Sequence, residues 1–172
     1  HDAAGRLLRA IDPMGKATDF EYFSAGAEAG YLNKVTDDAG VGRLNLTTQW
    51  TVDPVGNVLS TTSPRGFTVT YTVNRLNQVT HVAGPLGYET ELSHDENRKL
   101  WRTRTKNLDG DGVLSTELPW VETQWTFTLL GEPATVTHSV TGSTTATTTL
   151  AHDADDRVER VTHPGGREDK FE

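Results

Sequence analysis

The feature that most constrains this chain is a short pattern of turn-forming residues that recurs along its length. The pattern is Asp-x-x-Gly, followed by Pro-x-Gly eleven positions after the Asp, and four Pro-x-Gly triplets share this register. The residues at these positions are Asp2, Gly5, Pro13, Gly15, Asp53, Gly56, Pro64, Gly66, Pro85, Gly87, Asp95, Asp153, Pro164 and Gly166. Self-similarity of this kind indicates a repeat architecture in which each unit is one supersecondary element.

The pattern divides the chain into about seven units, which begin near residues 2, 27, 53, 74, 95, 128 and 153. The copies at 27 and 128 match less well, and the spacing grows where loops are inserted, above all at about residues 106–120. We therefore expect a single array over residues 1–172. Both ends cut a unit without a visible capping unit, so we expect an internal piece of a larger polypeptide, truncated at both ends.

Each unit is predicted to form two strands and two tight turns. The Asp side chain accepts hydrogen bonds from nearby backbone amides, and glycine adopts positive φ at no steric cost. Proline fixes φ for the second turn. Strand-length segments lie between the turns, and in residues 67–73 apolar side chains alternate with threonines. The sequence thus predicts an all-β fold of repeated antiparallel β-hairpins, and we find no helical periodicity.

A bulky residue stands three positions before the start of most units. This position holds Trp50, Tyr71, Leu92, Trp125 and Leu150. One large side chain per unit, stacked on one face of the sheet, forms a ladder shared between neighbouring hairpins. The 34% hydrophobic content of the 172 residues suits such a ladder better than a deep globular core.

Composition excludes several classes of protein. The net charge is −8, from 16 basic and 24 acidic residues, and no basic stripe is present, so we expect no nucleic-acid partner. No apolar run is long enough for a membrane span. The chain has no cysteine, which rules out disulfides, thiolate metal sites and thiol nucleophiles.

One segment of the long insertion resembles half of a calcium-binding loop. Asn107, Asp109 and Asp111 place oxygen-bearing side chains at alternate positions before Gly112, and Val113 would offer its backbone carbonyl. The second half of the match fails, since Leu118 stands at the twelfth position and Glu117 falls one residue early. Calcium is the one cofactor that the sequence suggests. The alternative is an ordinary hairpin tip, which favours the same residues.

No catalytic constellation is predicted. A Gly-x-Ser-x-Gly nucleophile elbow is absent, and turn formation explains the recurring carboxylates. His1, His94 and His152 fall in the position just before a unit, where we expect a stacking role, whereas His138 and His163 lie near turns without an identifiable partner.

The tryptophans divide into two pairs. Trp50 and Trp125 belong to the ladder, whereas Trp101 and Trp120 flank the long insertion. The second pair leaves open a platform on which sugar rings stack.

The units resemble the YD repeat of Rhs proteins. The first copy carries the resemblance through His1, Asp2, Gly5, Arg6, Leu7, Asp12, Pro13, Gly15, Thr18, Phe20 and Tyr22. The sequence departs from the pattern where His or Val replaces the signature Tyr and where Asn74 replaces Asp. The family includes bacterial polymorphic toxins, the C component of insecticidal toxin complexes and the teneurins.

The resemblance implies an extended, curved spiral sheet that forms part of a shell around a C-terminal toxin or effector. It implies a non-enzymatic structural segment of a secreted or cell-surface bacterial protein. Its partners would be the remainder of the parent polypeptide and an enclosed toxin domain. The alternative is a cell-surface adhesion or carbohydrate-binding module that is built from the same repeats and binds glycans.

Overall fold

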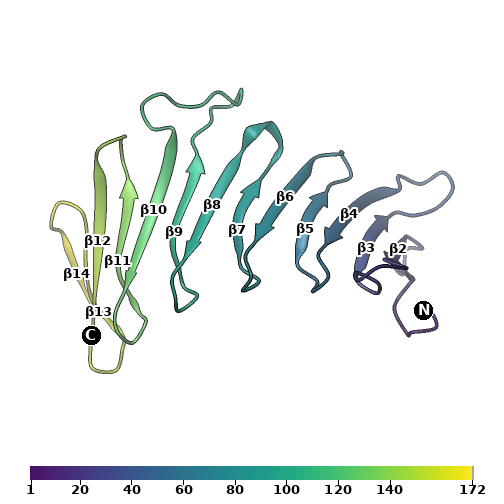
Figure 1. Ribbon diagram of the computed structural model, residues 1–172, viewed down its shortest axis with the longest axis horizontal. Helices are drawn as coiled ribbons and strands as arrows, with labels where there is room; N and C mark the ends of the chain where they lie inside the picture. Colours follow the sequence, from purple (N-terminus) through teal and green to yellow (C-terminus); the bar gives the residue numbers. More distant parts are fainter. Residues whose placement is uncertain (172) are drawn as a thin grey trace. The chain divides into compact units, whose positions relative to one another are not determined.

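The structure, a computed structural model, describes residues 1–171, and these form β-strands joined by turns (Figure 1). The strands are β1 (Arg9–Ile11), β2 (Ala17–Tyr22), β3 (Leu32–Asp37), β4 (Leu46–Val52), β5 (Val58–Thr62), β6 (Thr68–Val73), β7 (Val79–Ala83), β8 (Glu89–His94), β9 (Leu100–Lys106), β10 (Trp120–Phe127), β11 (Pro133–Ser139), β12 (Thr145–His152), β13 (Val158–Thr162) and β14 (Glu168–Lys170). The one helical element among these residues is a 3-10 turn, η1 (Pro85–Gly87).

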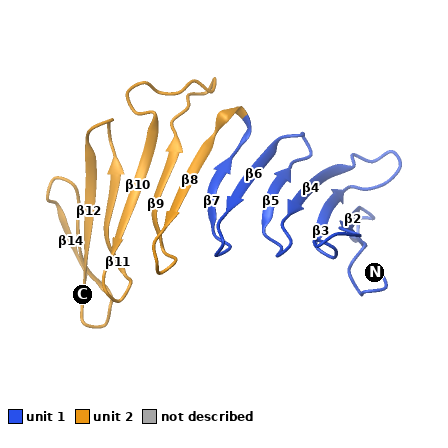
Figure 2. Cartoon of the chain, in the orientation of Figure 1, with its two compact units in different colours: residues 1–85 blue, residues 86–172 orange. Residues whose placement is uncertain are grey.

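Strand order in the sheet follows strand order in the chain, from β1 to β14. Within each of the two compact units, residues 1–85 and the residues from Leu86 onward, each strand pairs antiparallel with the next (Figure 2). The predicted all-β fold of sequential antiparallel hairpins is therefore confirmed. No helix in the described part of the chain is long and apolar enough to cross a membrane.

The Asp-x-x-Gly sequences form one kind of hairpin end, which we call the Asx tip. Asp53 is typical, because its N–H donates to the carbonyl of Asn57 (2.9 Å) while the N–H of Gly56 donates to the carbonyl of Asp53 (3.0 Å). Oδ1 of Asp53 accepts from the N–H groups of Val55 (3.0 Å) and Asn57 (2.8 Å). The Asx tips with this bonding are residues 2–6, 53–57, 74–78, 95–99, 128–132 and 153–157, with Asn74 and Thr128 in the first position of their tips. The side chain in the first position thus gives a partner to backbone N–H groups that the sharp turn would otherwise leave unpaired.

A β-bulge accompanies the Asx tips, with its extra residue on the strand that follows the tip. The register shifts fall at Glu21/Tyr22, Thr51/Val52, Thr72/Val73, Ser93/His94, Thr126/Phe127 and Ala151/His152. A bulge adds an unpaired residue to one strand and increases the local twist, so the turn and the bulge form one recurring device.

The unit expected to begin near Ala27 differs from the prediction. Its tip runs from Phe23 to Tyr31, because the N–H of Phe23 donates to the carbonyl of Tyr31 (3.0 Å) and the N–H of Gly30 to the carbonyl of Phe23 (2.9 Å). Gly30 keeps the position of the tip glycine. Four extra residues therefore lengthen this tip, which moves its start from Ala27 to Phe23.

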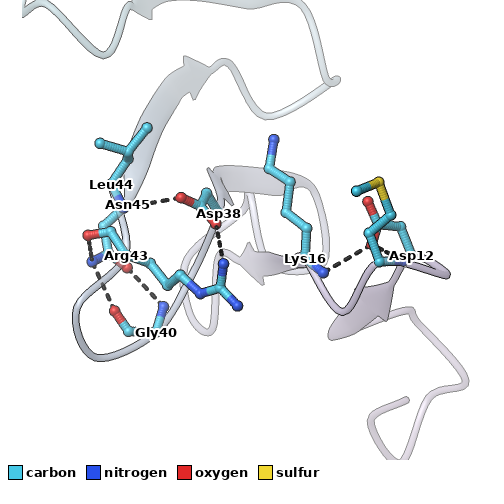
Figure 3. A network of polar contacts seen from close by, with 8 residues as sticks. Asp12, Lys16, Asp38, Gly40, Arg43, Leu44 and Asn45 are labelled. Carbon is cyan, nitrogen blue, oxygen red and sulfur yellow. Dashed lines mark hydrogen bonds and ion pairs between the residues drawn. The ribbon is translucent and has the colours of Figure 1, made fainter.

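The opposite hairpin ends carry the Pro-x-Gly turns and the longer loops. In the first, Oδ1 of Asp12 accepts from the backbone N–H groups of Met14 (2.9 Å) and Lys16 (2.8 Å). The next is the loop of residues 38–45, where Asp38 accepts from the N–H of Leu44 (3.1 Å) and pairs with Arg43 (3.6 Å; Figure 3). These loops hold their shape through their own side chains.

The two faces of the sheet differ in chemistry. One face is the ladder face. In the first compact unit, cross-strand register aligns Trp50 with Thr61 and Val69 on this face. In the second compact unit it aligns Trp125 with Val136. The polar face carries rows of threonine and charged side chains, including three successive hydroxyl-bearing residues on β4, β5 and β6. None of the described residues is fully buried, so the ladder is a half-buried ribbon without a deep core.

Neighbouring Asx tips contact one another through a repeated interaction, which we call the clasp. The last side chain of one tip reaches over the residue that holds the glycine position of the next tip. A Cβ added at Gly30 would lie 3.3 Å from Nη1 of Arg6, and one added at Gly56 would lie 2.7 Å from Cε1 of Tyr31. In the second compact unit, Nζ of Lys99 donates to the carbonyl of Gly131. The glycine therefore admits a neighbour as well as a positive φ.

The clasp predicts unequal effects for two glycine-to-alanine substitutions. Gly66 has φ of +80° and open space around it, so we expect Gly66→Ala to lower the free energy of unfolding by about 1 kcal/mol through backbone strain. Gly56 has φ of +91° and contacts Tyr31, so Gly56→Ala should cost about 2–3 kcal/mol. Urea denaturation of both variants measures the difference. Equal losses would contradict the clasp.

Candidate functional site

The recurring carboxylates serve the turns. The side-chain amide of Asn57 donates to Asp53 (2.7 Å) and holds the pKa of that carboxyl below its ordinary 3.8. Backbone hydrogen bonds from Arg6 and Arg157 lower the pKa of Asp2 and Asp153 in the same way. A carboxylate is the better acceptor, so binding by amides favours the charged form. These oxygens hold the backbone of their own tips.

These pKa shifts predict a loss of stability in acid. A carboxyl whose pKa is lower in the folded state contributes stability above its unfolded pKa of about 3.9 and loses it as the pH falls through the folded pKa. We therefore expect the free energy of unfolding to fall below about pH 4. Asp53→Asn removes one such carboxylate, so the stability difference between this variant and the native chain should shrink from neutral pH towards acid.

Urea denaturation across this pH range measures that difference. The matched control is Glu159→Gln, which removes an exposed carboxylate on β13. A pH-independent deficit in Asp53→Asn would show that the charge of Asp53 does not stabilise its tip.

The segment predicted to bind calcium forms a small hairpin within the loop of residues 107–119. Oδ1 of Asp109 accepts from the N–H groups of Asp111 (3.0 Å) and Val113 (2.8 Å), and the N–H of Asp109 donates to the carbonyl of Val113 (3.0 Å). Leu108 and Leu114 form a β-bridge behind this turn. Residues 109–113 therefore repeat the Asx-tip geometry.

The other predicted ligand serves the base of the loop. Asn107 donates from Nδ2 to the carbonyl of Leu118 (3.0 Å), and its N–H donates to the carbonyl of Pro119 (2.9 Å). Among residues 1–171, no group of three or more His, Cys, Asp or Glu side chains is arranged to hold a metal. The geometry accounts for these residues as a hairpin tip, and calcium binding stays a prediction.

Titration calorimetry tests calcium binding directly. If Asn107, Asp109 and Asp111 are ligands, millimolar calcium should give a saturable heat and raise the melting temperature, and Asp111→Asn should abolish both. The side chain of Asp111 makes none of the turn hydrogen bonds described above, so this substitution preserves the turn. The absence of heat in the native chain would remove calcium as a ligand.

The histidines are distributed over the sheet. His94 and His152 end β8 and β12, directly before Asx tips, and His1 precedes the first tip. Nδ1 of His138 lies 2.9 Å from Oγ1 of Thr123 on the neighbouring strand. Nε2 of His163 lies 2.8 Å from Oδ2 of Asp169, and this contact lowers the pKa of Asp169.

The structure separates the four tryptophans. Trp50 and Trp125 lie on the ladder face, where Trp50 helps to line a hollow of about 270 Å³ with Tyr71 and valines of β5, β6 and β7. Trp101 is the extra residue of the bulge at the start of β9, whereas Trp120 pairs with Lys106 at the other end of that strand. Trp101 and Trp120 thus lie at opposite ends of β9, and of the two only Trp120 lines the groove described below.

Trp120 lies among charged side chains on the polar face. The Arg104 guanidinium lies 4.0 Å from the centre of the indole ring, and Lys106 lies 5.9 Å from it. Both cations have carboxylate partners, since Arg104 pairs with Glu91 (3.4 Å) and Lys106 with Glu89 (2.7 Å). The stacking fixes the ring from the β9 side.

An open groove of about 560 Å³ adjoins Trp120. Its lining comes from residues 118–120, from Glu122 and Gln124 of β10, from Thr137 and Ser139 of β11, and from residues 141–145. A Cβ at Gly142 would lie 2.8 Å from the carbonyl oxygen of Glu117, so the loops at the two sides of the groove are in contact. The sequence indicated Trp120, but the other residues come together only through strand register.

The chain's sequential hairpins, with two turns in each unit, define a class of β-repeat proteins, and solved structures place the fold more closely. No protein-family model and no curated protein matches the chain. The solved structure of TcdB2-TccC3 without its hypervariable C-terminal region matches 91% of this chain with a TM-score of 0.53 and 15% identity. TcdB2-TccC3-TEV matches 94% with a TM-score of 0.50 and 15% identity.

The chain spans about 10% of the length of each of those two matched chains. The similarity extends over nearly all of the sheet at low sequence identity. The chain therefore has the fold of a segment of TcdB2-TccC3.

Proposed function

We propose that this chain is a non-enzymatic structural segment of an Rhs/YD-repeat protein and forms part of the wall of a β-shell. The observation that carries the proposal is the fold match to TcdB2-TccC3, which covers 91% of this chain and 10% of the matched one. The YD-type units in the sequence support the same family independently. Its partners are then the remainder of the parent polypeptide and a C-terminal toxin or effector enclosed by the shell.

The construction of the sheet supports a role in enclosure. Each hairpin pairs with the next through backbone hydrogen bonds, and the clasp adds a contact at the tips. A sheet of one layer separates two spaces, and its two faces carry different side chains. The mechanism is then a physical barrier, which requires backbone continuity from hairpin to hairpin and no catalytic group.

The recurring acidic residues are consistent with a non-enzymatic role. Asp2, Asp53 and Asp153 accept hydrogen bonds from their own tips and are held in the charged form. A secreted or cell-surface location follows from the same proposal, since shells of this family act outside the cytoplasm that produces them.

The second candidate is a cell-surface adhesion or carbohydrate-binding module. The observation that favours it is the groove beside Trp120, where an indole ring stands above polar side chains. This function is compatible with the shell, because the groove occupies one face of one part of the sheet.

A test of enclosure compares the two faces of one strand. Val69 is half-buried on the ladder face, and Thr70 is exposed on the polar face of β6. Because the chain has no native cysteine, Val69→Cys and Thr70→Cys each introduce a single thiol into it. In the full-length parent polypeptide, we expect a bulky polymer-linked maleimide to label either the Val69→Cys variant or the Thr70→Cys variant, but not both.

Two controls make this result specific. In the isolated chain, the same reagent should label both cysteines, and in urea it should label both in the parent. Equal labelling of both faces in the folded parent would contradict enclosure.

A further inference from the structure

The groove beside Trp120 has the size and composition of a small-molecule site. Its volume of about 560 Å³ falls within the range of roughly 300 to 1,000 Å³ common for ligand pockets. It lies wholly in the second compact unit and on the polar face of the sheet. One side is formed by Trp120 with Leu118 and Pro119, and the other by residues 141–144.

Trp120 is held ready for stacking. The Arg104 guanidinium lies against the ring at 4.0 Å and comes from β9, whereas the groove is lined from β10, β11 and β12. Arg104 also forms an ion pair with Glu91 (3.4 Å). An indole ring fixed in this way presents apolar surface at little entropic cost on binding.

Polar side chains form the floor of the groove. Gln124 lies opposite Thr137, and Ser139 lies opposite Thr145, on the face that also carries Glu122. Glu122 accepts from Arg102 (2.5 Å) and from the amide of Gln124. A carboxylate accepts about four hydrogen bonds and a primary amide donates two, so both side chains retain capacity for a ligand.

The electrostatics of the floor favour an uncharged ligand. Arg102 lowers the pKa of Glu122 and compensates its charge, and the cations behind Trp120 have their own carboxylate partners. The groove therefore offers no unpaired charge that would select an anion or a cation. Its apolar surface is confined to the side formed by Leu118, Pro119 and Trp120, whereas hydroxyl, amide and carboxylate groups form the floor.

We propose that this groove binds a neutral saccharide, with one sugar ring stacked on Trp120 and its hydroxyl groups bonded to Glu122 and Gln124. Sugar rings combine an apolar face of C–H groups with a rim of hydroxyls. An aromatic ring beside planar acceptors and donors matches both parts. The proposal rests on the carbohydrate-binding candidate above and names its ligand class and residues, and it is tested separately from the shell function.

Titration of the chain of residues 1–172 with neutral hexasaccharides of glucose and of N-acetylglucosamine tests the proposal. We expect saturable binding to at least one probe, with a change in tryptophan fluorescence. Trp120→Ala should weaken binding about tenfold or more, the equivalent of about 1.4 kcal/mol of stacking and contact energy. The matched control is Trp101→Ala, which removes a tryptophan from the far end of β9 and should leave the affinity unchanged.

A second variant guards against a folding defect in Trp120→Ala. Gln124→Ala shortens one floor residue on a paired strand, and it should weaken binding severalfold while the far-ultraviolet circular dichroism stays native. Failure of the native chain to bind either probe would overturn the proposal. Equal affinity in Trp120→Ala, or preference for an acidic oligosaccharide or a peptide, would also overturn it.

Discussion

The contact between successive Asx tips is the interaction on which the rest of the sheet depends. Because none of residues 1–171 is fully buried, hairpin spacing rests on backbone pairing and on the tips. The clasp explains which residues occupy the glycine position of a tip. Long side chains such as Tyr31 and Lys99 lie over a glycine, whereas the short Asn57 donates to Asn77 (2.9 Å). Asn77 adopts φ of +61°, so a residue other than glycine occupies this position where the side chain above it is short.

Most of the fold could be predicted because turn chemistry is local. An Asx tip needs only an acceptor and a residue that tolerates positive φ, and both are visible in the sequence. The start of the tip at residues 23–31 could not be predicted in this way, because Phe23 has no acceptor side chain and four extra residues break the spacing. Asp109 shows the converse limit. Alternating acidic residues before a glycine suit a calcium loop and an Asx tip equally, and in the structure Oδ1 of Asp109 accepts hydrogen bonds from the turn.

The groove could be predicted only in part, because side-chain direction depends on register. Trp120 and Trp125 lie five positions apart on β10, so strand alternation places them on opposite faces. This inference needs the start of β10, which the long insertion hides in the sequence. The neighbours of Trp120 on the groove floor are fixed by pairing with β11 and β12, which are joined to β10 through later turns.

The repeat architecture explains why insertions lie at the hairpin ends and not within the strands. Each repeat unit contacts mainly its neighbours, so the free energy of unfolding is close to a sum over the repeat units and their interfaces. An insertion within a strand would break ladder hydrogen bonds on both sides, whereas the insertion of residues 107–119 lies at a hairpin end and leaves the pairing of β9 with β10 intact. Its last residues also form one side of the groove. New chemistry can therefore arise at the hairpin ends while the strands preserve the wall.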